Sequence, residues 1–379
     1  MKRQVAISLP AVDEVEWVAI KEPISTGWLT QGPKVAEFEK NFSGAFNVKH
    51  SLAVTSCTTG LHLALAAVGV TAGDEVIVPS FSWVSTANAV EYCGAKPVFI
   101  DVDPYTYNIV PDQIKNKLTK KTKAIIPVHL FGLCADIDAV KAALPDNVFV
   151  LEDAACAVGS VYKGAFAGTL GDAACFSFHP RKVLTTGEGG MVTTNDTSLF
   201  DKMATLRNHG ASISDAMRTQ GPKPYHFADF DVVGFNYRMT DLQAAMGIVQ
   251  LQKLESFIAE RARWAKWYLD ELAGLDWLTC PKEGPHGRHG WQAFVVSIDP
   301  SKAPMPRNAI MEKLQEMGIV TRPGTQAIHM LGYYKNKYGL NDGDLPGAKA
   351  CYENTMALPL HNRMVPEDYE YVVQCLRSL

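Results

Sequence analysis

An acidic residue and a lysine frame the most informative stretch of the sequence, residues 151–190. Asp153 follows the apolar run 148–151, and Lys182 comes 29 residues later inside FSFHPRKVLTTGEGG (176–190). In parallel α/β sheets, ligand contacts gather at the carboxyl ends of the strands. Alone, a strand-end acid is more often structural, and a single lysine is more often a solvated surface charge. Together, they form a pattern that can bind and activate an aldehyde cofactor.

Pyridoxal 5'-phosphate is the cofactor that suits this pair. The lysine forms the Schiff base, and the acid holds the pyridine nitrogen. A carboxylate beside that nitrogen favours its protonated form, and the protonated ring stabilises a carbanion at the substrate carbon. Lys182 and Asp153 are therefore the catalytic candidates.

Further residues could hold the other parts of such a cofactor. The turn TSCTTG (55–60) joins an expected strand to a helix, and amides and hydroxyls at a helix N-terminus bind a phosphate dianion. Simple helix capping would need only one of those hydroxyls. Ser177 could add another hydroxyl. Trp83, in PSFSWVSTANAV (79–90), could stack on the ring, although a core position is commoner for an isolated tryptophan.

Composition and missing motifs exclude several other classes of protein. The chain has 36 basic and 40 acidic residues and a net charge of −4, which argues against a nucleic-acid or membrane-surface partner. There is no G-x-x-x-x-G-K-[ST] and no H-E-x-x-H, and GEGG (187–190) precedes a strand instead of a helix. The eight cysteines include no C-x-x-C pair, so we expect no metal site and a reducing, cytoplasmic location. The longest apolar run, 61–70, is too short to span a bilayer.

The elements that must position these residues alternate along the chain. Apolar strands and helices follow one another from residue 52 to 246, which indicates a mostly parallel sheet covered on both faces. Strands are expected at 52–55, 75–79, 97–100, 124–128, 148–151, 173–178 and 190–194, and helices at 59–69, 84–92, 111–118 and 137–143. A long helix is expected at 241–272, followed by a turn-rich stretch at 279–290, a strand at 292–298 and helices at 307–317 and 366–376. We expect a large domain over 1–245 and a smaller α+β domain over 246–379, with residues 1–30 as a segment that could pack on the small domain.

These stretches resemble the DegT/DnrJ/EryC1/StrS family of pyridoxal-phosphate-dependent sugar aminotransferases, which have the aspartate aminotransferase fold (fold type I). The resemblance covers residues 27–251. It is carried by GWLTQGPKVAEFEKNF (27–42), VTSCTTGLHLAL (54–65), DEVIVPSFSWVSTANAV (74–90), PVHLFG (127–132), EDAACAVGS (152–160), FSFHPRKVLTTGEGGMVTTN (176–195) and GFNYRMTDLQAAMGIVQL (234–251). It implies a large α/β domain whose mostly parallel central sheet is flanked by helices, and a smaller C-terminal α+β domain.

The resemblance also implies a role for each matching position. Lys182 falls on the Schiff-base lysine, Asp153 on the pyridine partner and Trp83 on the stacking aromatic. The positions that fall on phosphate contacts are Cys57, Thr58 and Ser177, together with Asn236, which falls on an asparagine that reaches the phosphate of the neighbouring subunit. The resemblance thus implies a homodimer with shared active sites. Some members carry histidine in place of the lysine and are dehydratases, so Lys182 favours transamination.

Two regions depart from the family pattern. Cys156 stands where the family usually has glutamine or histidine, close to the cofactor's phenolic oxygen, and a thiol is a poorer hydrogen-bond partner. The stretch VTRPGTQAIHMLGYY (320–334) lacks the form typical of nucleotide-sugar enzymes. Within it, His329 is a candidate substrate contact or a packed core histidine, and Trp28 and Thr30 are further substrate candidates.

We therefore expect an aminotransferase that moves an amino group from an amino acid, L-glutamate by preference, to a nucleotide-linked keto-sugar, with pyridoxamine 5'-phosphate as the intermediate cofactor form. A cyclitol ketone or another phosphorylated keto-sugar is the alternative acceptor. A pyridoxal-phosphate-dependent sugar lyase or dehydratase is the alternative reaction. A non-catalytic regulator or assembly protein is a third possibility, against which the intact Lys182 and Asp153 argue.

Overall fold

A seven-stranded sheet forms the centre of the larger part of the computed structural model, which describes residues 3–212, 225, 227–284 and 287–379. The strand β10 runs antiparallel to both of its neighbours, and the other strands share one direction. In spatial order the strands are β1 (His50–Val54), β10 (Gly190–Thr194), β9 (Ala173–Ser177), β6 (Phe149–Asp153), β5 (Thr122–Ile125), β2 (Glu75–Pro79) and β4 (Lys96–Ile100). The mostly parallel sheet predicted from the alternating pattern is confirmed.

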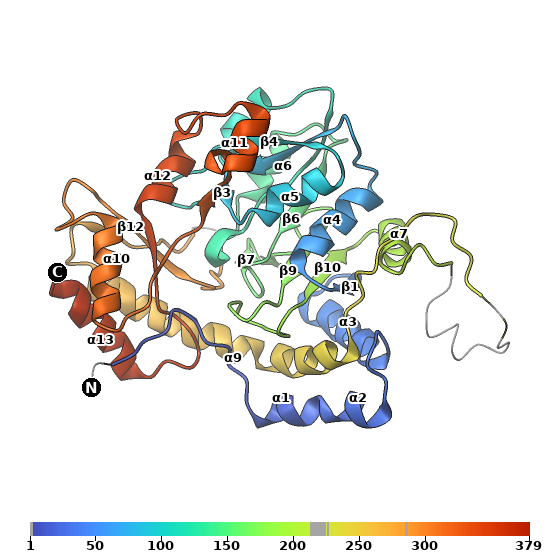
Figure 1. Ribbon diagram of the computed structural model, residues 1–379, viewed down its shortest axis with the longest axis horizontal. Coiled ribbons are helices and arrows are strands. Elements are labelled where there is room, and N and C mark those ends of the chain that lie inside the picture. Colours follow the sequence, from blue (N-terminus) through green and yellow to red (C-terminus); the bar gives the residue numbers. More distant parts are fainter. Residues whose placement is uncertain (1–2, 213–224, 226, 285–286) are drawn as a thin grey trace.

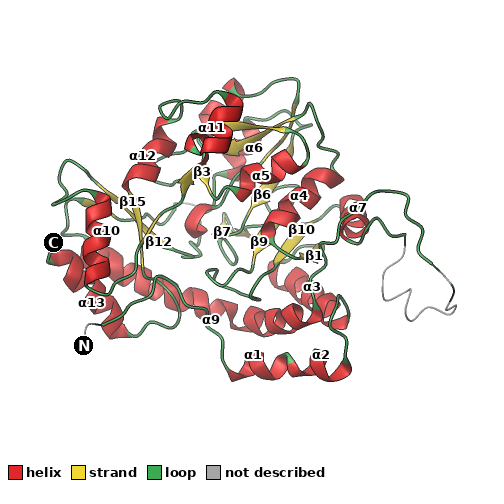
Figure 2. Cartoon of the chain, in the orientation of Figure 1, coloured by secondary structure: helices red, strands yellow, loops and turns green. Residues whose placement is uncertain are grey.

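Helices cover both faces of this sheet (Figure 2). Successive residues of a strand point to opposite faces, and in β1 Leu52 packs in one apolar cluster while Ala53 packs in another. The first cluster contains residues of α4 (Cys57–Ala67), α5 (Ser85–Tyr92) and α7 (Thr197–Arg207), and the second contains residues of α3 (Pro33–Phe46) and α9 (Asp241–Leu272). A further cluster holds α6 (Ile137–Ala142) against β2, β5 and β6. Burial on both faces explains why the strands read as continuous apolar runs.

One expected α-helix is a 3₁₀ helix instead. The predicted helix over 111–118 is η1 (Pro111–Asn116), and its buried anchor is Ile114. A single buried side chain gives a segment of this length little reason to extend, and short connectors commonly take the tighter 3₁₀ form. A second short 3₁₀ turn, η2 (Leu130–Gly132), follows β5.

A second sheet of four strands lies beside the first. It consists of β11 (Leu278–Thr279), β12 (Phe294–Ile298), β15 (Thr355–Leu358) and β13 (Arg322–Pro323), and it is covered by α10 (Arg307–Glu316) and α13 (Pro366–Arg377). Near the N-terminus, Val5 pairs with Ile319 and packs in the core of this sheet. The next two helices, α1 (Glu14–Ala19) and α2 (Lys21–Thr26), pack on α9 (Figure 1). Residues 285–286 of the predicted turn-rich stretch lie outside the described residues.

The helix α9 runs continuously from Asp241 to Leu272, and the hydroxyl of Thr240 caps it by accepting from the amide of Gln243. The predicted division at residue 245 therefore falls inside one helix (Figure 1) and stays a prediction. Part of the C-terminal half also packs on the large sheet. The strand β14 (Gln326–Ala327) pairs with β3 (Phe81–Ser82).

The segments that follow β14 remain on the large sheet. They are η3 (Ile328–Met330), α11 (Gly332–Tyr338) and α12 (Pro346–Asn354). Asp101, just after β4, accepts hydrogen bonds from the amides of Gly347 and Ala348 at the start of α12. A small hairpin of β7 (Val161–Tyr162) and β8 (Ala165–Phe166) follows β6. Among the described residues, no helix has both the length and the apolar character needed to cross a membrane.

Candidate functional site

The carboxyl ends of several parallel strands bring the predicted residues to one edge of the large sheet. Asp153 ends β6, Ser177 ends β9, and Cys57 begins the helix that follows β1. The Sγ atom of Cys57 lies 3.9 Å from Oδ1 of Asp153 and 3.6 Å from the carbonyl oxygen of Cys175 on β9. Residues that lie 96 positions apart in the chain are thus in contact.

Asp153 is buried, with 4% of its surface exposed, and each of its carboxylate oxygens accepts a hydrogen bond. The hydroxyl of Thr86 donates to Oδ2 at 2.8 Å, and the amide of Ala155 donates to Oδ1 at 3.2 Å. Burial raises the pKa of Asp153 above its ordinary value because it disfavours the charged form. Both hydrogen bonds, and the charge of Lys182, act in the opposite direction. The site therefore holds a desolvated acid whose ionised form depends on specific partners.

Lys182 lies in the loop between β9 and β10, and its amine points to a thiol. The Nζ atom donates to Sγ of Cys156 at 3.1 Å. Burial lowers the pKa of the Lys182 ammonium, but the hydrogen bond to Sγ of Cys156 raises it. The charge of Asp153 also raises it, and the net pKa of Lys182 lies above its ordinary value. Carboxylate, amine and two thiols thus form one electrostatically connected cluster.

The N-terminus of α4 offers amide donors at this edge. Ser56 and Thr59 cap the helix reciprocally, since each side-chain oxygen accepts from the other residue's amide. Among the described residues, the amides of Cys57 and Thr58 have no acceptor, and the dipole of the 11-residue helix favours an anion there. The strand β10 passes so close that a Cβ at Gly190 would lie 2.7 Å from the Cys57 nitrogen, which explains the last glycine of GEGG. The hydroxyl of Ser177 is 3.5 Å from the amide of His179.

Two further predicted contacts lie on the surface. The side chain of Trp83 is 62% exposed, so it is not a core tryptophan, and its ring is free to stack on a ligand. Asn236 is exposed and forms a β-bridge with Asn208. The next residue, Tyr237, accepts from the amide of Thr55 just after β1, so Asn236 lies near the α4 end of the edge.

The described contacts do not join the three substrate candidates to this cluster. The indole of Trp28 donates to the carbonyl of Gln31 at 3.2 Å, and the carbonyl of Thr30 accepts from the amide of Asp241. His329 is fully buried. Its Nδ1 lies 2.6 Å from the Ser80 hydroxyl, and its Nε2 lies 3.3 Å from the carbonyl of Asp342. Burial lowers the pKa of His329, and this geometry favours the packed-histidine alternative.

The sequence analysis did not identify the residues that hydrogen-bond to Asp153 or to the neighbouring Glu152. Thr86 contacts the carboxylate directly, and a run of hydroxyl residues after the second strand (Ser80, Ser82, Ser85 and Thr86) was the available indication. His129 donates from Nε2 to Glu152 at 2.8 Å, while its Nδ1 accepts from the amide of Ala135. Glu152 also accepts from three amides of the loop after β8. This buried pair fixes the strand end on which Asp153 sits.

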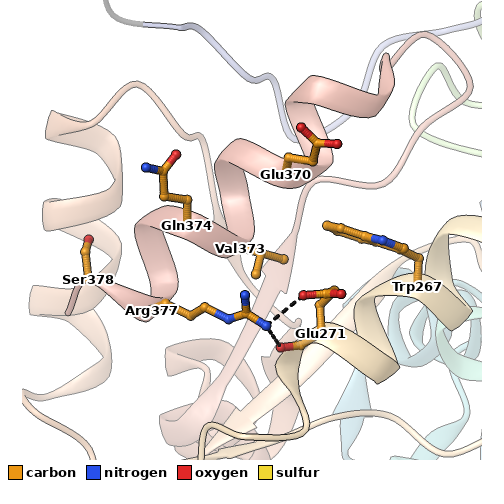
Figure 3. A pocket seen from close by; sticks show the side chains of 7 residues that line it. All are labelled: Trp267, Glu271, Glu370, Val373, Gln374, Arg377 and Ser378. Carbon is orange, nitrogen blue, oxygen red and sulfur yellow. Dashed lines mark hydrogen bonds and ion pairs between the residues drawn. The ribbon is translucent and has the colours of Figure 1, made fainter.

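A groove of about 320 Å³ between α9 and α13 shares no residue with the cluster (Figure 3). Arg377 donates to Glu271 across it, and Trp267 forms one wall. The groove holds no arrangement of acid, amine and free amides like the one at the strand ends. The candidate active site is therefore the edge of the large sheet.

The donor set at this edge fits pyridoxal phosphate. A lysine amine can bind its aldehyde, a buried carboxylate can face its ring nitrogen, and free amides at a helix N-terminus can hold its phosphate. The exposed ring of Trp83 can cover its face. Each part of the cofactor thus has a partner among residues that the fold brings to the same edge.

Comparisons with known proteins agree with this chemistry. The model of the DegT/DnrJ/EryC1/StrS aminotransferase family matches residues 10–377. GDP-perosamine synthase from Caulobacter vibrioides is 39% identical over 376 residues, covering 98% of this chain and 97% of that protein. The spore coat polysaccharide biosynthesis protein SpsC from Bacillus subtilis is 38% identical over 374 residues, covering 98% and 96%.

Solved structures show the same architecture with the cofactor. Spr1654 from Streptococcus pneumoniae, solved in its PMP form, superposes with a TM-score of 0.92 at 27% identity, covering 99% of this chain and 98% of that chain. A PLP form of the same protein gives 0.91 at 26% identity, with the same coverage. The family match spans nearly the whole chain. The chain therefore belongs to the DegT/DnrJ/EryC1/StrS aminotransferase family and is a pyridoxal-phosphate-dependent aminotransferase.

Proposed function

We propose that this enzyme transfers the amino group of L-glutamate to a keto-sugar carried on a nucleotide. The observation that carries the proposal is the cluster of Lys182, Cys156, Asp153 and Cys57 at the strand ends of the large sheet. The nucleotide-linked acceptor is supported by the similarity to GDP-perosamine synthase, whose name refers to a nucleotide-linked amino sugar. The similarity to SpsC supports a product used in a polysaccharide.

Each residue of the cluster has a distinct task in this proposal. Bound pyridoxal phosphate supplies an electron sink that stabilises negative charge at the substrate carbon. Asp153 holds a proton on the ring nitrogen because its carboxylate is anionic and oriented by two hydrogen bonds. The Nζ atom of Lys182 would take the proton from the α-carbon of the amino donor and deliver it to the cofactor carbon that carried the aldehyde. In the second half-reaction the same amine moves the proton in reverse.

The remaining residues bind and orient. The phosphate is held by the amides of Cys57 and Thr58 and by the hydroxyl of Ser177. The ring of Trp83 stacks on the cofactor ring. Cys156 contacts the lysine amine, and the family resemblance places it near the cofactor's phenolic oxygen. Trp28 and Thr30 remain candidate substrate contacts.

We further propose that two copies of the chain build each site. Several exposed apolar side chains lie close together in the sequence just before Asn236. They are Tyr225, Phe227, Phe230, Val232 and Val233, of which Val233 is 91% exposed. A patch of this kind indicates a surface that a partner covers. The family resemblance implies that a second copy seated there places Asn236 against the phosphate of the neighbouring site.

A cytoplasmic location is supported by the thiols. All eight cysteines are free in the structure, including the one beside Lys182, and such thiols persist in a reducing compartment.

The experiment follows the amino group in a single turnover. The enzyme is first converted to its pyridoxamine form with L-glutamate, freed of the oxo acid, and then mixed with a panel of nucleotide-linked keto-sugars, free keto-sugars and cyclitol ketones. A matching acceptor should restore the absorbance of the cofactor aldehyde within one turnover. Lys182→Ala is the control and should show no return. If only cyclitol ketones or unlinked keto-sugars restore the absorbance, the nucleotide-linked acceptor is wrong. If L-glutamate never produces the pyridoxamine form, the donor is wrong.

A further inference from the structure

A chain of two hydroxyl groups runs to the carboxylate of Asp153. The hydroxyl of Thr86 donates to Oδ2 of Asp153 at 2.8 Å. The hydroxyl of Ser82 lies 3.0 Å from the hydroxyl of Thr86. Thr86 is fully buried and Ser82 is 1% exposed, so neither hydroxyl can exchange its partner for bulk water.

The chemistry of these groups sets the direction of the chain. An ionised carboxylate can only accept, and a hydroxyl carries one proton. The Thr86 hydroxyl donates its one hydrogen to the Asp153 carboxylate, so its oxygen can only accept a hydrogen bond from the Ser82 hydroxyl. The order is therefore Ser82 to Thr86 to Asp153. A hydroxyl that itself accepts a hydrogen bond is a stronger donor, because hydrogen bonds in a chain polarise one another.

The two hydroxyl-bearing residues, Ser82 and Thr86, belong to different secondary-structure elements. Thr86 lies in the first turn of α5, and its amide donates to the carbonyl of Trp83 at 3.1 Å. Thr86 therefore contacts both the backbone of Trp83, the proposed stacking residue, and the carboxylate of Asp153, which we propose faces the ring nitrogen. Ser82 lies on β3, where it pairs with Gln326 of β14. The C-terminal half of the protein thus holds Ser82, the first residue of the hydrogen-bond relay from Ser82 through Thr86 to Asp153, in place.

Asp153 needs this support because of its surroundings. A buried carboxylate tends toward its neutral form, and the pKa of Asp153 is raised by that burial. The Thr86 hydroxyl is the largest of the influences that oppose burial. Hydrogen bonds to a charged group are worth more than those to a neutral one. Loss of the Thr86 hydroxyl would favour a proton on Asp153 and leave its Oδ2 atom without a donor, with only the amide of Ala155 still holding Oδ1.

We propose that Thr86, oriented by Ser82, is a positioning residue that keeps the Asp153 carboxylate ionised and aimed at the cofactor's ring nitrogen. The inference rests on the proposed role of Asp153, and Thr86 itself touches neither cofactor nor substrate in this scheme. Its removal should therefore change the protonation of the ring nitrogen more than it changes cofactor affinity.

The test uses the holoenzyme loaded with pyridoxal phosphate labelled with ¹⁵N in the ring. Thr86→Val keeps the branched shape and removes the hydroxyl. We expect the ¹⁵N resonance to move toward the position of neutral pyridine and kcat to fall roughly 10- to 150-fold, the loss of one hydrogen bond to a charged group. The dissociation constant of the cofactor should change by less than about fivefold, because the phosphate contacts remain. Thr86→Ser should restore the ¹⁵N position.

Thr355→Val is the matched control. Thr355 is also fully buried, and its hydroxyl donates to the carbonyl of Cys351 at 2.6 Å, away from Asp153. It should lower stability as much as Thr86→Val while leaving the ¹⁵N position and kcat unchanged. If the ¹⁵N resonance moved by a similar amount in both variants, the loss of any buried hydroxyl would have this effect. The proposal that Thr86 acts on the ring nitrogen through Asp153 would then be wrong.

Asp153→Asn separates failure of the relay from failure of the proposed role of Asp153. If Asp153→Asn moves the ¹⁵N resonance and Thr86→Val does not, the relay is wrong and the role of Asp153 stands. If Asp153→Asn leaves the resonance in place, both fall. Should Thr86→Val not fold, Ser82→Ala decides: a smaller movement in the same direction supports the relay, and an unchanged resonance overturns it.

Discussion

The amine of Lys182 and the thiol of Cys156 form a direct hydrogen bond, with Nζ and Sγ 3.1 Å apart. The family resemblance places position 156 near the cofactor's phenolic oxygen. In this chain the same side chain also touches the group that binds the cofactor and moves the proton. The residue at position 156 is therefore able to tune the lysine as well as the ring.

The pH dependence of cofactor capture should reflect this contact. The pKa of Lys182 lies above its ordinary value of 10.5, so the amine is protonated at neutral pH, and only its neutral form attacks an aldehyde. We expect the rate at which cofactor-free protein captures pyridoxal phosphate to rise about tenfold per pH unit from pH 7 to 10, as for a base far below its pKa. Stopped-flow absorbance measures this rate.

Cys156→Ala removes one of the influences that raise the pKa of Lys182, so the variant should capture the cofactor faster than the wild type at any fixed pH below 10. Cys280→Ala, another half-buried free thiol, is the control and should not change the rate. A rate that levels off below pH 9 in the wild type would contradict the raised pKa.

Borohydride reduction should fix the cofactor to one lysine. We expect the added mass on the peptide that contains Lys182, because its amine lies in the cluster of Asp153, Cys57 and Cys156. Lys182→Ala should lose the label and both half-reactions. Lys163 pairs with Asp138 on the surface, and a label found there or on Lys202 would show that the Schiff-base lysine was assigned wrongly.

Sharing of the site between two subunits can be tested by complementation. Lys182→Ala should be inactive, and Asn236→Ala should bind the cofactor more weakly, by roughly 1.5–3 kcal/mol for one lost hydrogen bond to a charged group. In a mixed dimer, one site carries both defects and the other carries neither. Co-refolding the two variants should therefore restore up to about a quarter of wild-type activity at limiting cofactor, since half of randomly mixed dimers have one intact site.

The control is each variant refolded alone. Lys182→Ala should regain no activity, and Asn236→Ala should regain only the low activity that its weakened cofactor binding allows at the same cofactor concentration. Mixed dimers are identified by a mass tag on one chain. If they form and activity does not return, Asn236 serves its own subunit and the shared site is wrong.

The sequence predicted those parts of the site that local patterns encode. Asp153 and Lys182 follow apolar strands, and Ser56 and Thr59 form a cap within four residues of one another. Contacts between distant segments left no such pattern. Thr86 meets Asp153 across 67 positions, and His329 meets Ser80 across 249. Whether a histidine is packed or faces a substrate depends on such contacts, so the sequence left both alternatives for His329 open.

Two-residue strands were equally hard to predict. The pairing of β3 with β14 joins Ser82 to Gln326, and neither strand is long enough to show an alternating pattern. Their existence follows from the return of the C-terminal half onto the large sheet. The boundary predicted at residue 245 lies within α9, inside the helix that the sequence predicts over 241–272.

Stability should fall in acid partly because of one buried histidine, His289. Its Nδ1 accepts the amide of Trp291 at 2.8 Å and its ring stacks on that tryptophan, so the folded protein holds the ring neutral. Burial lowers the pKa of His289 from 6.5 to about 3. Between pH 6.5 and about 3, the histidine is protonated in the unfolded protein and neutral in the folded protein. The free energy of unfolding therefore falls as the pH falls through this range.

His289→Asn should reduce this acid sensitivity, because an asparagine oxygen can accept the same amide and cannot take up the proton. Between pH 7 and 4.5 the free energy of unfolding should fall by about 2–3 kcal/mol less in the variant than in the wild type. Urea unfolding at the two pH values measures the difference. The half-exposed His50 offers the control His50→Asn, which should keep the wild-type pH dependence. An equal fall in His289→Asn and the wild type would show that His289 is already protonated in the folded protein at pH 4.5, and that its contact with Trp291 does not keep it neutral.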